Sequence, residues 1–115
     1  MTKQERDTIL MQLTLSKRPA AILRCFLGTH YAVMNQEHNS VIFDFGGNRA
    51  LNRCEIALNE DDLYDVTFWL QRRDGRKHNT KEFKDIFCDS LYELFERTTG
   101  LRLSFSGVGN GLRFC

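Results

Sequence analysis

Residues 51–75 have the sequence LNRCEIALNEDDLYDVTFWLQRRDG, in which two runs of alternating side chains precede a turn signal. The runs are Leu51–Leu58 and Leu63–Leu70. In the second run, one face of an extended chain would carry Tyr64, Val66, Phe68 and Leu70. The opposite face would carry Asp65, Thr67, Trp69 and Gln71. A period of two is typical of a strand that buries one face, so both runs are predicted to be strands of one sheet.

The pair Asp74-Gly75 is the strongest short hairpin signal in the chain. It predicts that the next extended run, Arg76–Phe83, turns back to pair with Leu63–Leu70. Because Arg76–Phe83 is polar and weakly patterned, we expect it to be an edge strand, where charge discourages pairing with other molecules.

A helix is expected to follow, from Ile86 to Thr99. Its apolar side chains recur at helical spacing: Phe87, Leu91, Leu94 and Phe95. Gly100 is placed to end this helix in a left-handed conformation. Leu101, Leu103 and Phe105 alternate again and predict a final strand.

The N-terminal half predicts two helices and a second hairpin. Residues 3–15 begin after Thr2, with Glu5 three residues later, which is the pattern of a capping box. A second helix is expected over Pro19–Leu27 and a strand pair at Tyr31–Met34 and Val41–Phe45. The chain is therefore predicted to be a single α+β domain over residues 1–115. Its antiparallel sheet would have four to six strands, with N-terminal helices and a C-terminal amphipathic helix packed on one face.

Composition narrows the function classes. The 115 residues carry a formal net charge of +1, so no global field attracts nucleic acid or membrane. The longest apolar runs, such as Val66–Leu70, are too short to span a bilayer. The N-terminal residues are of mixed charge and lack the apolar segment of a signal peptide. A cytoplasmic location, no membrane association and no cofactor are the expectations.

The strongest functional feature is the segment 72–84, called the basic hairpin below. Its cationic residues are Arg72, Arg73, Arg76, Lys77, Lys81 and Lys84. Because Asp74 and Glu82 offset two of these six charges, a net charge of +4 remains over thirteen residues. A cationic hairpin can lie along a phosphate backbone or enter a groove, which predicts a nucleic-acid-binding surface. The structural alternative is a solvated sheet edge protected by its charge.

The exposure of Trp69, on the neighbouring predicted strand, distinguishes these two interpretations. An exposed Trp69 beside the cations would favour stacking on a base. A buried Trp69 would favour the protected edge. Trp69 is therefore included with the six cations as a candidate nucleic-acid-binding residue.

An acidic segment lies before the predicted strand 63–70. Its carboxylates are Glu55, Glu60, Asp61, Asp62 and Asp65. The simpler interpretation is a solvated turn in which Asn59 or Asp62 bonds its own backbone. The alternative is a surface that imitates nucleic acid or meets a basic partner.

The sequence also contains a loose match to the motif of a metal-dependent nuclease. Asp65 followed by Glu82 and Lys84 is similar to the D…E-x-K arrangement in which carboxylates hold Mg²⁺ and a lysine helps to activate water. Without structural context such a motif is only a hypothesis. We therefore expect no metal and no enzymatic activity.

Two segments resemble a family of small uncharacterised proteins carried by phages, prophages and related mobile elements. They are EIALNEDDLYDVTF (55–68) and IFCDSLYELFERTTGL (86–101). The family shares a DxYDVxF strand pair and a closing helix that ends in FxxxTGL. This chain departs from it at Leu63, where a small polar residue is usual, and in the tail after Leu103. The resemblance implies a mobile-element setting and supplies no catalytic residue.

The sequence thus favours a non-enzymatic accessory protein that binds nucleic acid through the basic hairpin. The alternative partner is a host protein, which a small inhibitor or adaptor would bind. A Mg²⁺-dependent nuclease is the third hypothesis.

Overall fold

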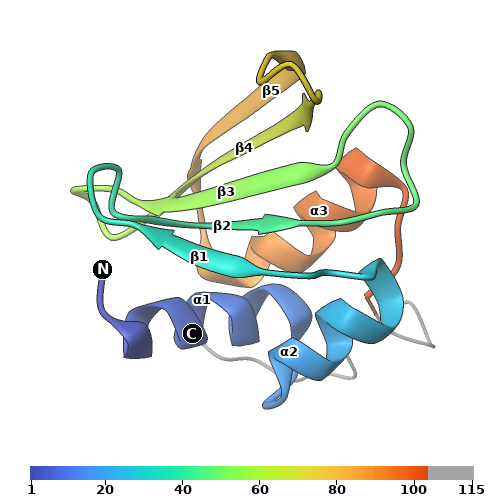
Figure 1. Cartoon of the computed structure of the whole chain (residues 1–115). Helices are drawn as coiled ribbons and strands as arrows, with labels where there is room; N and C mark the ends of the chain where they lie inside the picture. Colours follow the sequence, from blue (N-terminus) through green and yellow to red (C-terminus); the bar gives the residue numbers. More distant parts are fainter. Residues whose placement is uncertain (104–115) are drawn as a thin grey trace.

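The computed structural model describes residues 1–103 and has an α+β architecture, with a five-stranded antiparallel sheet and its helices on one side (Figure 1). The strands are β1 (Ala32–Asn35), β2 (Ser40–Asp44), β3 (Arg53–Leu58), β4 (Tyr64–Gln71) and β5 (Lys77–Ile86). Each strand pairs with its sequence neighbours, in the order β1-β2-β3-β4-β5. The helices are α1 (Lys3–Thr14), α2 (Pro19–Ile22) and α3 (Leu91–Thr99). The π-helical turn η1 (Leu23–Leu27) continues α2, and the 3-10 turn η2 (Cys88–Ser90) precedes α3. The predicted fold class is confirmed.

The N-terminal helices begin and end where local signals place them. Thr2 Oγ1 accepts the Glu5 N–H at 3.1 Å, and the Glu5 carboxylate accepts the Thr2 N–H at 2.9 Å, so the predicted capping box forms. These hydrogen bonds lower the pKa of Glu5. Pro19 is the first residue of α2, and Gly28 ends η1 with a φ of 64°. No helix among the described residues has both the length and the apolar character to cross a bilayer.

The core lies between the sheet and the helices. Alternate residues of β4 face it, and Phe68 is completely buried. Phe95 of α3 lies at its centre: its ring centroid is 6.0 Å from that of Phe43, 5.3 Å from Phe45 and 5.9 Å from Phe68. The prediction that a C-terminal amphipathic helix closes one face of the sheet is therefore confirmed.

Two predictions near the C-terminal helix are wrong. Phe87 is 63% exposed and precedes the helix, because the chain makes the turn η2 before α3 begins at Leu91. Leu101 and Leu103 are not in a strand. Leu103 is instead buried, and its N–H donates to the Glu96 carboxylate at 2.9 Å, so the chain folds back against α3. Phe105, the third residue of the predicted strand, lies outside the described residues.

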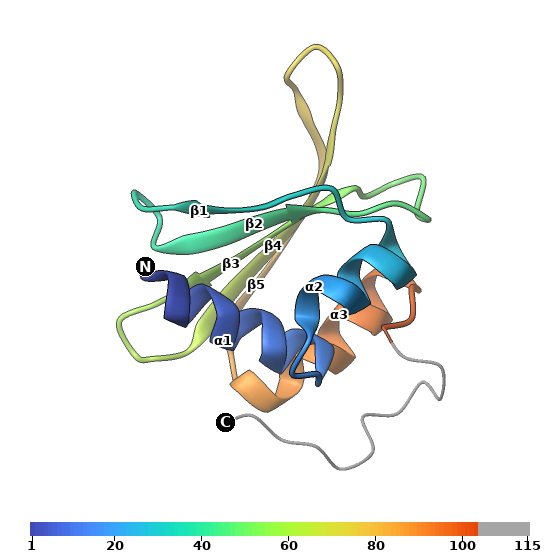
Figure 2. The same ribbon diagram turned by 60° about the horizontal axis from the view of Figure 1, so that its bottom comes forward.

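Strands β4 and β5 form a hairpin whose turn end rises away from the rest of the sheet (Figure 2). The register of this pair shifts between Tyr64 and Val66 and again between Phe68 and Leu70. Within β5, Asn79 and Asp85 each have a φ of 55°. Asn and Asp adopt this left-handed conformation more readily than most residues, and such irregularities increase the local twist of a strand pair. The irregular β5 therefore accounts for the direction of the hairpin.

Candidate nucleic-acid interface

The tip of the basic hairpin is a tight turn. The Arg72 N–H donates to the Arg76 carbonyl oxygen and the Gly75 N–H to the Arg72 carbonyl oxygen, both at 3.0 Å. Asp74 Oδ1 accepts the Arg76 N–H at 2.9 Å, and Gly75 has a φ of 85°. The turn predicted from Asp74-Gly75 is thus confirmed, and it holds the cations of both strand ends close together.

All six candidate cations of the basic hairpin are exposed: Arg72, Arg73, Arg76, Lys77, Lys81 and Lys84. Arg76 Nε lies 3.5 Å from Asp74 Oδ2, but both side chains are more than half exposed, so this ion pair binds weakly. A wide, shallow concavity of about 510 Å³ runs beside the tip, and Arg72 and Arg73 are among its lining residues. The hairpin therefore offers a cluster of hydrated cations that an anion can reach.

The base of the hairpin is fixed to the body. Asn79 Nδ2 donates to the carbonyl oxygen of Ala50 at 3.2 Å, which ties β5 to the loop before β3. His78 pairs with Leu70, and its Nε2 is buried without a hydrogen-bond partner among the described residues. His78 and Asn79 therefore lie between the cations at the tip and Lys81 and Lys84 farther along β5.

Trp69 is buried rather than exposed. Only 3% of it is accessible, although it lies on the sheet face that has no helices. Its Nε1 donates to Gln71 Oε1 at 3.0 Å, and Lys77 Nζ lies 4.4 Å from its ring centroid. A ring covered in this way has little free surface for a base, so the condition that would favour stacking by Trp69 is not met. This result favours the protected-edge interpretation for this part of the site.

Three residues that sequence reasoning missed as site residues lie on the same face: Tyr31, Asp44 and Arg53. The register places Asp44 beside Arg53 and Arg53 beside Trp69, so these side chains form one row across β2, β3 and β4. Tyr31 extends the row at the β1 end, where it is 39% exposed and Arg53 Cζ is 5.5 Å from its ring centroid. The alternation of Tyr31 and Val33, which are both exposed, is the sequence pattern that could have placed Tyr31 on this face.

Asp44 holds the chain segment that carries Tyr31. Its Oδ1 accepts the N–H of His30 at 2.8 Å and of Tyr31 at 3.0 Å, and its Oδ2 lies 2.7 Å from His30 Nδ1. Burial raises the pKa of Asp44, but the hydrogen bonds from Tyr31 and His30 outweigh burial and lower that pKa below its usual value. A carboxylate that accepts several donors is an anchor, so the position of Tyr31 is fixed at its backbone.

The acidic segment is organised by local hydrogen bonds. Asn59 Oδ1 accepts the N–H groups of Asp61 at 2.9 Å and Leu63 at 3.1 Å. This is the solvated turn of the simpler interpretation. The Glu55 carboxylate accepts the Ser40 hydroxyl and lies 3.2 Å from His38 Nδ1.

Asp65, the first carboxylate of the nuclease pattern, bonds with groups of the protein. Asp65 Oδ1 accepts the Asn59 amide and the Asp85 N–H, each at 3.1 Å. Within residues 1–103, no group of three or more His, Cys, Asp or Glu side chains is arranged to hold a metal ion.

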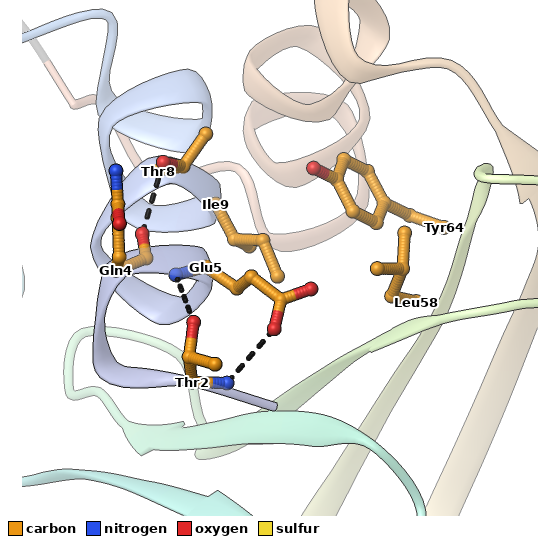
Figure 3. Close-up of a pocket in the computed structure, with 7 residues that line it drawn as sticks. All are labelled: Thr2, Gln4, Glu5, Thr8, Ile9, Leu58 and Tyr64. Atoms are coloured by element: carbon orange, nitrogen blue, oxygen red, sulfur yellow. Dashed lines mark hydrogen bonds between the residues drawn. The ribbon is translucent and has the colours of Figure 1, made fainter.

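A second concavity, of about 240 Å³, lies between α1 and the start of β4 (Figure 3). Its polar groups bond within the protein: Thr2 with Glu5, Thr8 with the Gln4 carbonyl oxygen, and the Tyr64 hydroxyl with Gln12 Oε1 at 2.6 Å. Burial raises the pKa of Tyr64, so its hydroxyl stays protonated as a donor. These bonds stabilise the packing of α1 on the sheet.

Comparisons with known proteins identify no relative of this chain. No family model matches the chain, and searches of curated proteins and of solved structures find no significant match.

Proposed function

We propose that this chain is a non-enzymatic nucleic-acid-binding module of a mobile genetic element, and that the basic hairpin contacts phosphates. The observation that carries the proposal is the position of the cations. All six are exposed, and four of them lie at the turn end of the hairpin, which rises from the sheet (Figure 2): Arg72, Arg73, Arg76 and Lys77. A projecting cationic hairpin can approach a polyanion without a clash from the body of the protein. The resemblance to phage and prophage proteins supports the mobile-element setting.

The charge distribution supports an oriented contact. The whole chain carries a net charge of +1 and the basic hairpin +4, so the remaining residues carry a net −3. A polyanion is attracted to the hairpin and repelled by much of the rest of the surface. Because Trp69 is covered by Lys77, the contact at the hairpin is electrostatic and independent of sequence.

The test is a salt titration of binding to a fluorescent DNA duplex of arbitrary sequence. If each of the six cations neutralises one phosphate, the slope of log K against log salt is about −5. The double change of Arg73 and Arg76 to Ala reduces the size of this slope by about 2. Both side chains are exposed, so the fold is retained.

The matched control removes two exposed cations elsewhere. Arg18 and Arg24 lie on the helical side, at α2 and η1, and their change to Ala alters the net charge by the same amount. The control variant is expected to bind with the slope of the unchanged protein. Absence of binding at low salt, or an equal loss in the control, contradicts the proposal.

A second candidate is a protein-binding role, in which the chain acts as an inhibitor or adaptor of a host protein. The specific observation is Phe87, whose large apolar side chain is 63% exposed. Copurification from host lysate with and without nuclease treatment separates the candidates. A host protein that is retained after nuclease treatment and lost on Phe87→Ser supports this second role.

A further inference from the structure

One face of the sheet has no helix packed on it. In both views the helices lie together on the opposite side (Figures 1 and 2). The core residues of β2, β3 and β4 point to that helical side: Val41, Phe43, Cys54, Ile56, Val66 and Phe68. The residues that alternate with them therefore line the other side, called the open face below.

The open face is divided by charge along the strands. Near the basic hairpin it carries Arg53 and Lys77, each beside an aromatic ring. The carboxylate of Asp44 lies in the same row, but it is buried and held by the N–H groups of His30 and Tyr31. Toward the opposite strand ends it carries Glu55, Asp65 and Glu82; Glu55 pairs with Thr67, and Thr67 pairs with Glu82. An anion that binds this face is directed to the end nearest the hairpin.

The two rings at the cationic end differ in their accessibility. Lys77 covers Trp69, which retains 3% of its accessible surface. Arg53 Cζ lies 5.5 Å from the centroid of the Tyr31 ring, and Tyr31 retains 39% of its accessible surface. An exposed aromatic ring beside a guanidinium is the combination on which the bases of single-stranded nucleic acids stack.

We propose that a single-stranded nucleic acid crosses the open face at its cationic end, and that Tyr31 is the residue on which a base stacks. This inference rests on the proposed function and specifies its partner. Arg53 and Lys77 would contact the phosphates between Tyr31 and the basic hairpin. The bases of a duplex are already paired and stacked, so a duplex has no free base for Tyr31.

The width of the open face fits a short single-stranded nucleic acid. Tyr31 adjoins β1 and Trp69 belongs to β4, three strand spacings away. At about 4.8 Å between neighbouring strands, the path across the face is roughly 14 Å. A path of that length accommodates a few nucleotides, comparable to the roughly two or three bases that stack on the four-stranded sheet of an RNA-recognition module.

The backbone holds Tyr31 independently of its side chain. Its N–H donates to Asp44 Oδ1 at 3.0 Å, and this hydrogen bond survives a change of side chain. Substitutions of Tyr31 therefore test binding rather than folding. Trp69, the single tryptophan of the sequence, lies in the same row and provides a fluorescence signal for occupancy of the face.

The experiment measures the affinity for an oligothymidylate of about 12 nucleotides and for a duplex of equal length, by fluorescence anisotropy and by Trp69 emission. Tyr31→Ala is expected to weaken binding of the single strand at least about fivefold and to leave duplex binding unchanged. Tyr31→Phe, which keeps the ring, is expected to bind the single strand within about twofold of the unchanged protein. Addition of the single strand is expected to change the emission of Trp69.

Phe87→Ala is the matched control, since Phe87 is an exposed aromatic residue that precedes η2 and α3. It is expected to leave the affinity for both probes unchanged. If Tyr31→Ala binds the single strand as tightly as the unchanged protein, or if Phe87→Ala weakens binding equally, the inference is wrong while phosphate binding by the hairpin stands. If the unchanged protein binds neither probe at low salt, the proposed function and the inference both fail.

Discussion

The two faces of the sheet bury their aromatic residues by different means. On the helical face, Phe68 is completely buried beneath α3, where Phe95 contacts it. On the open face, its neighbour Trp69 is 3% exposed although no helix lies above it. The cover there is the side chain of Lys77, which reaches across the hairpin.

This difference shows that low accessibility alone does not identify a core residue. Phe68 is enclosed by apolar groups from several elements, whereas Trp69 lies outside the apolar core cluster and has the ammonium group of Lys77 over its ring. The helical face therefore holds the apolar core, whereas the open face is organised by polar and cationic side chains such as Asp44 and Lys77. Three changes test this division, each in terms of the free energy of unfolding.

Phe95→Ala is expected to have the largest effect. It removes the ring that contacts three other aromatic rings in the core, and such a truncation costs about 3–5 kcal/mol. Urea denaturation followed by circular dichroism measures the loss. A cost below about 1 kcal/mol would show that α3 does not seal the sheet.

Asp44→Asn is expected to cost about 1–3 kcal/mol at neutral pH, because the hydrogen bonds from His30 and Tyr31 lose their charged acceptor. The pKa of Asp44 is lowered in the folded protein, so its carboxylate stabilises the fold above the unfolded pKa of about 3.9. That stabilisation is lost as the pH falls through the lower pKa of the folded state.

The measurement is urea denaturation of both proteins between neutral pH and about pH 2. The difference in stability between the unchanged protein and Asp44→Asn should be constant above about pH 5 and decrease in acid. A difference that does not change with pH would mean that the carboxylate charge does not stabilise the segment 29–31.

Phe87→Ser is expected to change stability by less than about 0.5 kcal/mol, because Phe87 is 63% exposed. Leu91→Ala, one helical turn later and buried, should cost about 2–5 kcal/mol in the same urea assay. Equal costs for the two variants would place Phe87 in the core after all.

The elements that depend on local sequence were predictable. The alternation in 63–70, the Asp74-Gly75 turn, the Thr2–Glu5 capping box and the stops at Gly28 and Gly100 are all found where the residues indicate them. Each depends on groups that are close in the chain. Local geometry is thus sufficient to determine each of these features.

The features that depend on distant residues were not predictable. The spacing of Phe87 and Leu91 fits one helix, but the turn at Cys88–Ser90 breaks the helical phase between them. The position of Tyr31 depends on Asp44 in β2, thirteen residues later. The burial of Trp69 depends on Lys77 across a turn, and no period in the sequence indicates which lysine lies over a ring.

The order of the strands has a consequence for how the chain folds. Every strand pairs with its sequence neighbours, so the sheet can assemble by successive hairpins without long loops to close. The contact between α1 and α3 joins elements that are distant in sequence, so we expect it to form after the hairpins. We therefore expect rapid, single-exponential folding on a timescale closer to milliseconds than to seconds, without a search for remote strand partners.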